Sequence, residues 1–262
     1  MVTSDGRSIQ LRDVIVPSVS WTVFRSQGEY DLIIHFAFLN QDRVTDFGRA
    51  AYVDANRNLT SDLLKVASRN ISGSVLAASS GAVSSYQSNI DSQFSYEIYS
   101  GVKQEMEDQI LESGLFKNIG LMRIWNLSGI YANLDSPYAL SSFIKQALAG
   151  NIINVTGSKG TQRTYVNAQE MMWVYLMELG NYNHAPLDSG GFNTNLLDLA
   201  KLVADTVGDV RVVSAETTSS SPLALYLPNA REFNQMADTY SLTLSNIQQQ
   251  VEMVVEYMKM AR

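Results

Sequence analysis

Three short apolar runs, separated by stretches with helical periodicity, constrain the fold of this chain more than any other feature. The runs are DLIIHFAFL at 31–39, SGSVLAASSGAVSS at 72–85 and GLMRIWNLSGIY at 120–131. A short, nearly continuous apolar run is typical of a strand covered on both faces, as in a parallel sheet. Repeated alternation of such strands with helices predicts an α/β sheet with right-handed crossovers.

The intervening segments carry the helical pattern. Apolar positions at helical spacing predict a helix of about six turns over 47–70. A second helix begins near Tyr99 and stops near Gly114. Beyond Tyr131 we expect a further set of elements: helices at 136–150, 168–180, 195–208 and from about 244, a strand at 209–215, and a short polar turn at 157–166.

Composition excludes several classes of function. The net charge is −7, and the lysines and arginines are scattered, which argues against a nucleic-acid surface. No apolar run approaches the roughly eighteen residues of a membrane span, and the first residues lack the apolar core of a signal peptide. The chain has no cysteine, which fits a reducing compartment, so a cytoplasmic location is expected. The two histidines, His35 and His184, have no carboxylate cluster at ligand spacing, so no protein-held metal is predicted.

The stretch YSGVK places Tyr99 four residues before Lys103 at the start of the second helix. Positions i and i+4 share one helix face, so the two side chains can interact. A neighbouring cation favours the phenolate, which would let Tyr99 exchange a proton nearer neutral pH. The alternative is that Tyr99 packs in the core and Lys103 is a solvated surface charge.

Other candidate residues follow the predicted strands. His35 to Phe38 end the first strand, Ser79 to Gly81 the second, and Trp125 to Leu127 the third. In open α/β sheets, ligands bind at the carboxyl ends of the strands. The convergence of these ends with the Tyr99–Lys103 pair predicts a ligand site at this edge of the sheet.

In this order, the segments resemble the extended short-chain dehydrogenase/reductases, especially the nucleotide-sugar epimerases and dehydratases. DLIIHFAF resembles the family's strand ending in His-x-Ala, and VLAASSGAV its strand with the active-site hydroxyl. YSGVK matches the Tyr-x-x-x-Lys pair, and RIWNLSGIY is similar to the Arg-x-x-Asn-x-x-Gly segment. RTYVNAQE resembles the family's substrate-facing Arg segment, and the resemblance extends over about residues 30–260.

The resemblance implies an α/β fold with a Rossmann-like parallel sheet flanked by helices and a small C-terminal α/β substrate lobe. Residues 1–130 would form the cofactor domain with the Ser/Tyr/Lys site. Residues 131–262 would form mainly the substrate-binding lobe, with segments returning to the sheet. The family also dimerises through helices that correspond to about 47–70 and 99–113, so a homodimer is expected.

The resemblance also assigns site residues. The catalytic residues would be Ser80, Tyr99 and Lys103. The cofactor-binding residues would be Phe36, Ala37, Phe38, Asn56, Ser79, Tyr99, Lys103 and Asn126. The substrate-binding residues would be Ser80, Asn126 and Arg163. Each has a plainer reading: the serines as small residues at a strand end, Asn126 as a structural residue, Arg163 as a solvated charge.

The implied activity is that of an NAD-dependent nucleotide-sugar epimerase or reductase, an isomerase or oxidoreductase of polysaccharide biosynthesis. Tyr99 would remove a proton from a sugar hydroxyl while a hydride passes to NAD, and Ser80 would orient the same oxygen. Dehydratases of this family carry an Asp-Glu pair just after the active-site hydroxyl. Gly81 and Ala82 stand there instead, which favours an epimerase or reductase.

One departure from the family pattern bears on all of this. The sequence contains no G-x-x-G-x-x-G turn, whose backbone N–H groups would meet the cofactor pyrophosphate, and only about thirty residues precede the first clear strand. The expected sheet is therefore N-terminally incomplete, and the apolar edge of the strand at 31–38 needs a cover. That cover would be the N-terminal thirty residues, a second subunit or a segment absent from this chain.

Three interpretations follow from this departure. The chain is an epimerase or reductase shortened at its N-terminus, a non-catalytic relative that binds a sugar nucleotide or a partner without turning over NAD, or a subunit whose main role is association.

Overall fold

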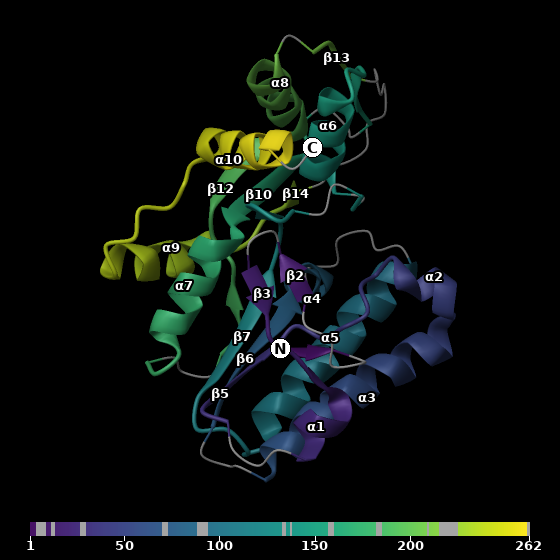
Figure 1. Ribbon diagram of the computed structural model, residues 1–262, viewed down its shortest axis with the longest axis vertical. Helices are drawn as coiled ribbons and strands as arrows, with labels where there is room; N and C mark the ends of the chain where they lie inside the picture. The colour runs from purple at the N-terminus through teal and green to yellow at the C-terminus, as the bar shows by residue number, and fades with distance from the viewer. Residues whose placement is uncertain are drawn as a thin grey trace. The chain divides into compact units, whose positions relative to one another are not determined.

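The computed structural model describes residues 1–3, 9–11, 14–26, 30–69, 73–87, 94–132, 135–136, 138–156, 160–181, 185–208, 210–214 and 225–260 (Figure 1). The chain divides into two compact units, each built from segments distant in the sequence. Unit 1 comprises Met1–Ser79, Asn89–Leu121 and Leu179–Pro186. Unit 2 comprises Ser80–Ser88, Met122–Glu178 and Leu187–Arg262.

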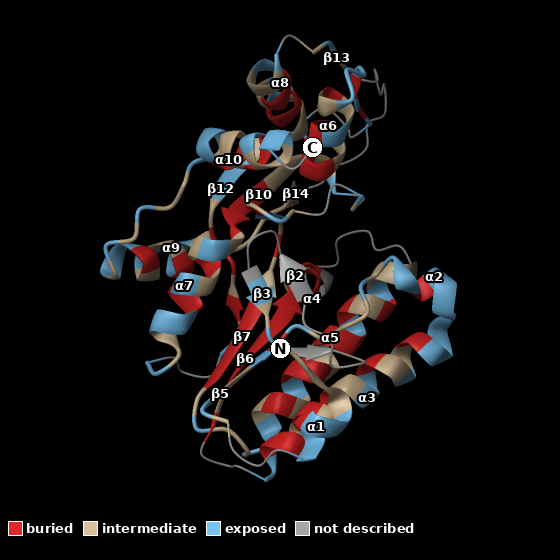
Figure 2. Cartoon of the chain, viewed as in Figure 1, coloured by how far each residue is buried: buried red, intermediate tan, exposed pale blue. Residues whose placement is uncertain are grey.

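Unit 1 is built on parallel strands in the order β7-β6-β5. These strands are β5 (Leu32–His35), β6 (Ser74–Ser80) and β7 (Ile119–Ile124), of which unit 1 holds all but the last residues of β6 and β7. The register of β5 on β6 runs from Leu32 opposite Ser74 to His35 opposite Ala77. Strand β6 is buried along nearly its whole length (Figure 2), which explains the continuous apolar run from Val75 to Ala78. The predicted α/β parallel sheet is confirmed.

Two long helices of unit 1, α3 (Arg49–Ala67) and α5 (Phe94–Glu112), lie side by side (Figure 1). The short helix α2 (Arg43–Phe47) precedes α3. The helices and the sheet share an apolar core made by Leu63, Val75, Ala77, Met106, Ile110, Ile119 and Leu121. The helices predicted at 47–70 and from near Tyr99 are therefore confirmed, and α5 begins five residues before Tyr99.

The first residues of the chain form small elements of their own. Strand β1 (Val2–Thr3) pairs with β4 (Val19–Ser20), and β2 (Ile9–Leu11) pairs with β3 (Val14–Val16). Helix α1 (Trp21–Ser26) follows. Within the described part of the chain, no strand pairs with the outer side of β5.

This end strand carries exposed apolar side chains. Ile34 on β5 is 44% exposed, and Phe36, just beyond it, is 51% exposed. The apolar edge expected from the sequence is thus present among the described residues.

Unit 2 is organised around β10 (Gln162–Asn167). Its partners are β12 (Phe192–Asn195), antiparallel, and β14 (Leu225–Tyr226) and β8 (Leu127–Ser128), both parallel. Two further parallel pairs complete the strands: β9 (Ile153–Val155) with β13 (Val212–Ser214), and β11 (Leu187–Asp188) with the end of β7. The helices are α4 (Gly81–Gln87), α6 (Ala139–Leu148), α7 (Ala168–Glu178), α8 (Leu196–Val207), α9 (Ala230–Thr239) and α10 (Ile247–Met260).

The main core of unit 2 lies between α6, α8 and α10 and the strands beside them. Its largest fully buried members include Ile144, Ile153 and Tyr165. The helices predicted at 136–150, 168–180 and 195–208 and the last helix are confirmed, as is the strand within 209–215.

The polar turn predicted at 157–166 is wrong in its second half. Residues 162–167 form β10, in which Thr164 to Asn167 are all buried. The sequence QRTYVN lacks the apolar alternation that is typical of a strand. It forms a buried strand nevertheless, because neighbouring residues satisfy its polar groups: the Thr164 hydroxyl, for instance, is hydrogen-bonded to Asn193 of β12. Tertiary pairing overrides the polar composition here.

Among the described residues, no helix combines the length and the apolarity needed to cross a bilayer.

Gly191 tests the packing of β10 against β12. Its φ is +115°, and an added Cβ would lie 2.1 Å from the Tyr165 carbonyl oxygen. We expect Gly191→Ala to reduce the free energy of unfolding by roughly 2–4 kcal/mol, because backbone strain and a backbone clash combine. Urea unfolding measures this.

Gly101→Ala is the matched control. Gly101 lies inside α5, and an added Cβ meets nothing within 4 Å. This change should stabilise the chain by about 0.5–1 kcal/mol, since alanine is the better helix former. Equal stabilities for the two variants would contradict the described backbone at Gly191.

Candidate active site

The segment after β5 is held in place by α3. The Tyr52 hydroxyl donates to the Leu39 carbonyl at 2.7 Å, and the Asn56 Oδ1 accepts the Leu39 N–H at 2.7 Å. Asn56 is fully buried, and its Nδ2 also lies 3.5 Å from the Leu39 carbonyl. Asn56, predicted to bind the cofactor, is thus engaged with the backbone that follows Phe36, Ala37 and Phe38.

Phe38 reaches from this segment onto Lys103 of α5. The Lys103 Nζ lies 3.6 Å from the centre of the Phe38 ring and donates to the Ala78 carbonyl of β6 at 2.6 Å. Lys103 is only 4% exposed, so the alternative that it is a solvated surface charge is wrong. Burial lowers the pKa of Lys103 to about 7, and the negative charge of Glu107 opposes that shift.

Tyr99 lies one turn before Lys103 on α5 and is partly buried. Its ring packs edge-on against Phe38, with the ring centroids 6.1 Å apart, and it borders the small cluster of Val44, Tyr52 and Ile98. Phe38 therefore contacts both residues of the predicted proton-transfer pair.

Ser79 and Glu107 form a buried hydrogen bond in the same region. The Ser79 hydroxyl donates to the carboxylate of Glu107, which is fully buried. Ser79 was predicted to bind the cofactor, whereas Glu107 was not predicted as a site residue. Its signal was present, because Glu107 follows Lys103 by four residues on the same helix face.

His35 ends β5 beside these groups. It is 6% exposed, and within the described residues its Nε2 has no hydrogen-bond partner. Burial, reinforced by the charge of Lys103, lowers the pKa of His35 to about 4. The side chain is therefore neutral at physiological pH.

Ser80, the predicted catalytic serine, belongs to unit 2. It is 6% exposed, and its Oγ accepts the Ala82 N–H at 3.1 Å at the start of α4. The next residue is Gly81, and Trp125 leaves no room there for a side chain, since a Cβ at Gly81 would lie 2.3 Å from the indole ring. In the part of the chain that the structure describes, the Ser80 hydroxyl has no hydrogen-bond acceptor, so its proton is available to donate.

Of the predicted substrate residues, Arg163 lies on β10 and Asn126 is hydrogen-bonded to it. The Asn126 Nδ2 donates to the Thr164 carbonyl at 3.0 Å, and the Asn126 carbonyl accepts the Val166 N–H at 3.2 Å. The Arg163 Nη1 donates to the Gln162 carbonyl at 2.8 Å.

An aromatic stack adjoins Arg163. The guanidinium carbon lies 5.6 Å from the ring centre of Tyr226, and that ring lies 4.3 Å from Trp125. Trp125 was among the candidate residues at the end of the third predicted strand, whereas Tyr226 was not predicted as part of the site. The structure thus groups Arg163, Tyr226, Trp125 and Gly81 in unit 2.

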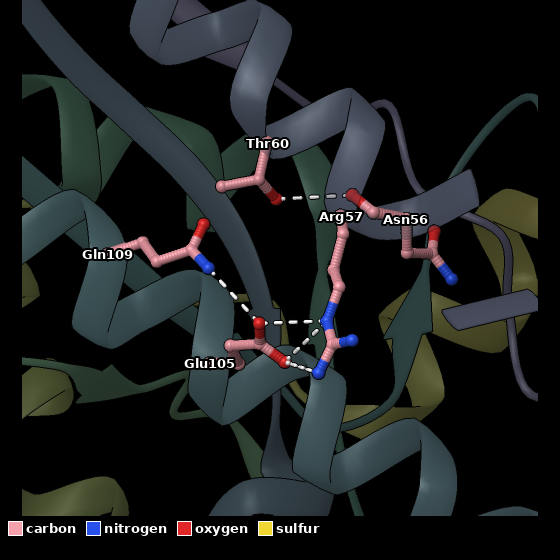
Figure 3. Close-up of polar contacts among 5 residues, drawn as sticks. All are labelled: Asn56, Arg57, Thr60, Glu105 and Gln109. Atoms are coloured by element: carbon pink, nitrogen blue, oxygen red, sulfur yellow. Dashed lines mark hydrogen bonds and ion pairs between the residues drawn. The ribbon is translucent and has the colours of Figure 1, made fainter. Parts of the chain in front are cut away.

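A shallow groove lies on unit 1, on the surface formed by α3 and α5. It is lined by Arg57, Asn58, Ser61, Leu64, Lys65, Ser68 and Gln109. At its side Glu105 accepts three hydrogen bonds from Arg57, the shortest 2.9 Å, and one from Gln109 at 3.1 Å (Figure 3). Figure 3 also shows Asn56 on the adjoining turn, where its carbonyl accepts the Thr60 hydroxyl. The groove contains no predicted catalytic residue.

Comparison with known proteins identifies the family. The sequence model of the NAD-dependent epimerase/dehydratase family matches residues 13–188, which is about two thirds of the chain. No curated protein sequence matches.

Solved structures share the fold. UDP-glucose 4-epimerase from Thermotoga maritima, in complex with UDP-glucose, is 16% identical, with a TM-score of 0.72 over 92% of this chain and 81% of that one. UDP-N-acetylglucosamine 4-epimerase from Methanobrevibacter ruminantium, in complex with UDP-N-acetylmuramic acid, is 15% identical, with a TM-score of 0.72 over 94% and 84%. UDP-glucose 4-epimerase from Thermus thermophilus, in complex with NAD, is 15% identical, with a TM-score of 0.70 over 94% and 86%. These likenesses confirm the Rossmann-like α/β fold.

NAD is the cofactor by which the matched family is described, and the donor set of unit 1 fits one half of it. Tyr99 supplies a phenol and Lys103 an ammonium on one face of α5, and these two groups can donate hydrogen bonds to the hydroxyls of a nicotinamide ribose. The Lys103 ammonium carries two further N–H groups besides the one given to Ala78, although Phe38 covers it. The pyrophosphate half has no glycine-rich turn in this sequence.

The buried His35 predicts a loss of stability in acid. The unfolded chain binds a proton at His35 near pH 6.5 and the folded chain only near pH 4, so stability falls as the pH drops through this window. Between pH 8 and pH 4.5, we expect the free energy of unfolding of His35→Gln to fall by about 2 kcal/mol less than that of the parent. Denaturant unfolding between pH 8 and 4.5 gives the comparison.

Above pH 7 this titration contributes nothing in either chain, so the pH profiles should differ in shape only on the acid side. Parallel acid limbs for the parent and the variant would contradict a neutral, buried His35.

Proposed function

Because the chain belongs to the NAD-dependent epimerase/dehydratase family, we propose that it is a nucleotide-sugar epimerase or reductase whose proton-transfer residue is Tyr99. The observation that carries this proposal is the buried Lys103 ammonium, one helical turn from Tyr99 and fixed by the Ala78 carbonyl. A cation withdrawn from water acts more strongly on a neighbouring phenol than a surface lysine would.

In this proposal, Tyr99 as phenolate accepts the proton of a sugar hydroxyl, and Lys103 stabilises the phenolate charge. NAD, when bound, supplies the hydride acceptor and later the hydride donor. Ser80 donates a hydrogen bond to the reacting oxygen. Arg163, whose guanidinium is steadied by Tyr226, binds the diphosphate of the substrate.

Two residues favour an epimerase or reductase over a dehydratase. A dehydratase needs an additional acid and base to expel water, and Gly81 and Ala82 after the serine carry neither. Gly81 is moreover constrained to glycine by Trp125, so this position cannot hold an acidic side chain without displacing the indole. UDP sugars are the first substrates to test, since two of the similar solved structures hold one.

The second candidate function is a relative that binds a sugar nucleotide without turning over NAD. Two observations support it: the absence of a glycine-rich turn in the sequence, and the Phe38 ring that covers the Lys103 ammonium. Titration of NAD and NADH, followed by fluorescence or calorimetry, separates the two functions. Absence of binding at millimolar cofactor would exclude catalysis by this chain and favour the second.

Tyr99→Phe tests the role of the phenol. The change removes only the hydroxyl, so we expect turnover to fall at least about a thousandfold while NADH affinity stays within about threefold. Coupled assays with UDP-glucose and UDP-N-acetylglucosamine give the turnover, and fluorescence titration gives the affinity. A variant with full activity would exclude Tyr99 as the base.

We further propose a cytoplasmic homodimer that associates through α3 and α5. The groove on these helices is lined by polar side chains and Leu64, and the Arg57–Glu105 ion pair lies beside it. A second copy of the chain would pack on this surface. Ser61→Arg places a long cation within the groove and should shift a dimer to monomers in sedimentation velocity. Asp205→Arg on α8 is the control, and identical behaviour of the two variants would place the interface elsewhere.

A further inference from the structure

One face of α5 is hydrogen-bonded to two successive residues near the end of β6. Lys103 donates to the carbonyl of Ala78, and one turn later Glu107 accepts the hydroxyl of Ser79. Both α5 side chains are buried, with Lys103 4% exposed and Glu107 fully inaccessible. Two buried hydrogen bonds therefore join α5 to the two residues of β6 that precede Ser80 in the sequence.

A buried carboxylate is costly unless it is paired and hydrogen-bonded. Glu107 gains both forms of compensation here: the hydroxyl of Ser79 and the opposite charge of Lys103. The benefit is mutual, since the negative charge of Glu107 raises the pKa of Lys103 against the larger effect of burial.

We propose that Glu107 is a positioning residue: it keeps Lys103 protonated beside Tyr99 and fixes the hydroxyl-bearing end of β6 through Ser79. The geometric basis is that Lys103 and Glu107, one helical turn apart on α5, are hydrogen-bonded to the successive residues Ala78 and Ser79 of β6. That this matters for cofactor binding rests on the proposed function.

The groups that face Lys103 come from several elements. His35 approaches from β5 and is neutral at physiological pH, while Tyr99 and Glu107 share α5 with Lys103. Tyr52 of α3 interacts with Tyr99. Among the described residues around Lys103, Glu107 is the one acidic side chain, so its replacement should leave the ammonium of Lys103 without a negative charge nearby.

Glu107→Gln separates charge from shape. The amide oxygen still accepts the Ser79 hydroxyl, whereas the negative charge is lost. We expect the proton affinity of Lys103 to fall about tenfold, which NMR of isotopically labelled lysine side chains measures, with Lys103→Arg to assign the signal.

Glu105→Gln is the matched control. Glu105 lies two residues away on α5 but faces outward, where it pairs with Arg57 (Figure 3). Its removal should leave the titration of Lys103 unchanged. Ser79→Ala should likewise preserve that titration while lowering stability, because the carboxylate keeps its charge but loses a hydrogen bond.

The functional consequence is a change in a pH profile. Lys103 is charged below its pKa and neutral above it, so the weaker proton affinity in Glu107→Gln moves the alkaline loss of NADH binding to lower pH. NADH binding should weaken about tenfold at pH 8 and much less at pH 6. If the parent chain binds no NADH, the proposed function fails, while the lysine titration still decides the role of Glu107.

An unchanged Lys103 titration in folded Glu107→Gln would overturn the inference. If this variant does not fold, Glu107→Asp and Glu107→Asn replace it as a pair, because both shorten the side chain and only asparagine removes the charge. A lower proton affinity of Lys103 in Glu107→Asn than in Glu107→Asp supports the inference, and equal proton affinities in the two variants contradict it.

Discussion

The buried Lys103 ammonium is the interaction on which the site in unit 1 depends. An ammonium withdrawn from water requires compensation, and three groups provide it: the Ala78 carbonyl, the Phe38 ring and the charge of Glu107. Each comes from a different place in the sequence, so the demand of one charge orders β6, the segment after β5 and α5 together. Asn56 extends this order to α3, because it fixes the backbone next to Phe38.

The parallel sheet and the principal helices could be predicted from the sequence because their signals are local. Apolar runs at 31–39 and around Val75 and Leu121 are of strand length, and the helices between them keep a regular apolar spacing. Strand β10 could not be predicted in the same way. Its polar residues are satisfied by strands that begin twenty-five residues or more after it along the chain, so a short stretch of sequence does not contain that information.

The candidate site shows the same division. Tyr99 and Lys103 could be paired from their spacing, whereas the burial of Lys103 could not, since a lysine on an amphipathic helix is usually solvated. Glu107 continues the same spacing, yet only its contact with Ser79 separates it from Glu105, an acidic neighbour on the outer face of α5. Asn56 was assigned to the cofactor from the family resemblance, and the structure shows that its side chain binds the backbone of Leu39.

The contact between Gly81 and Trp125 couples two positions that lie forty-four residues apart. A methyl group at position 81 would lie 2.3 Å from the indole, so alanine there and tryptophan at 125 are mutually exclusive unless one of them is displaced. An evolutionary path to this pair must therefore pass through glycine with a smaller side chain at 125 before the indole can enter. Substitutions at either position are conditional on the other, and a library that varies them one at a time would misjudge which residues this corner of unit 2 accepts.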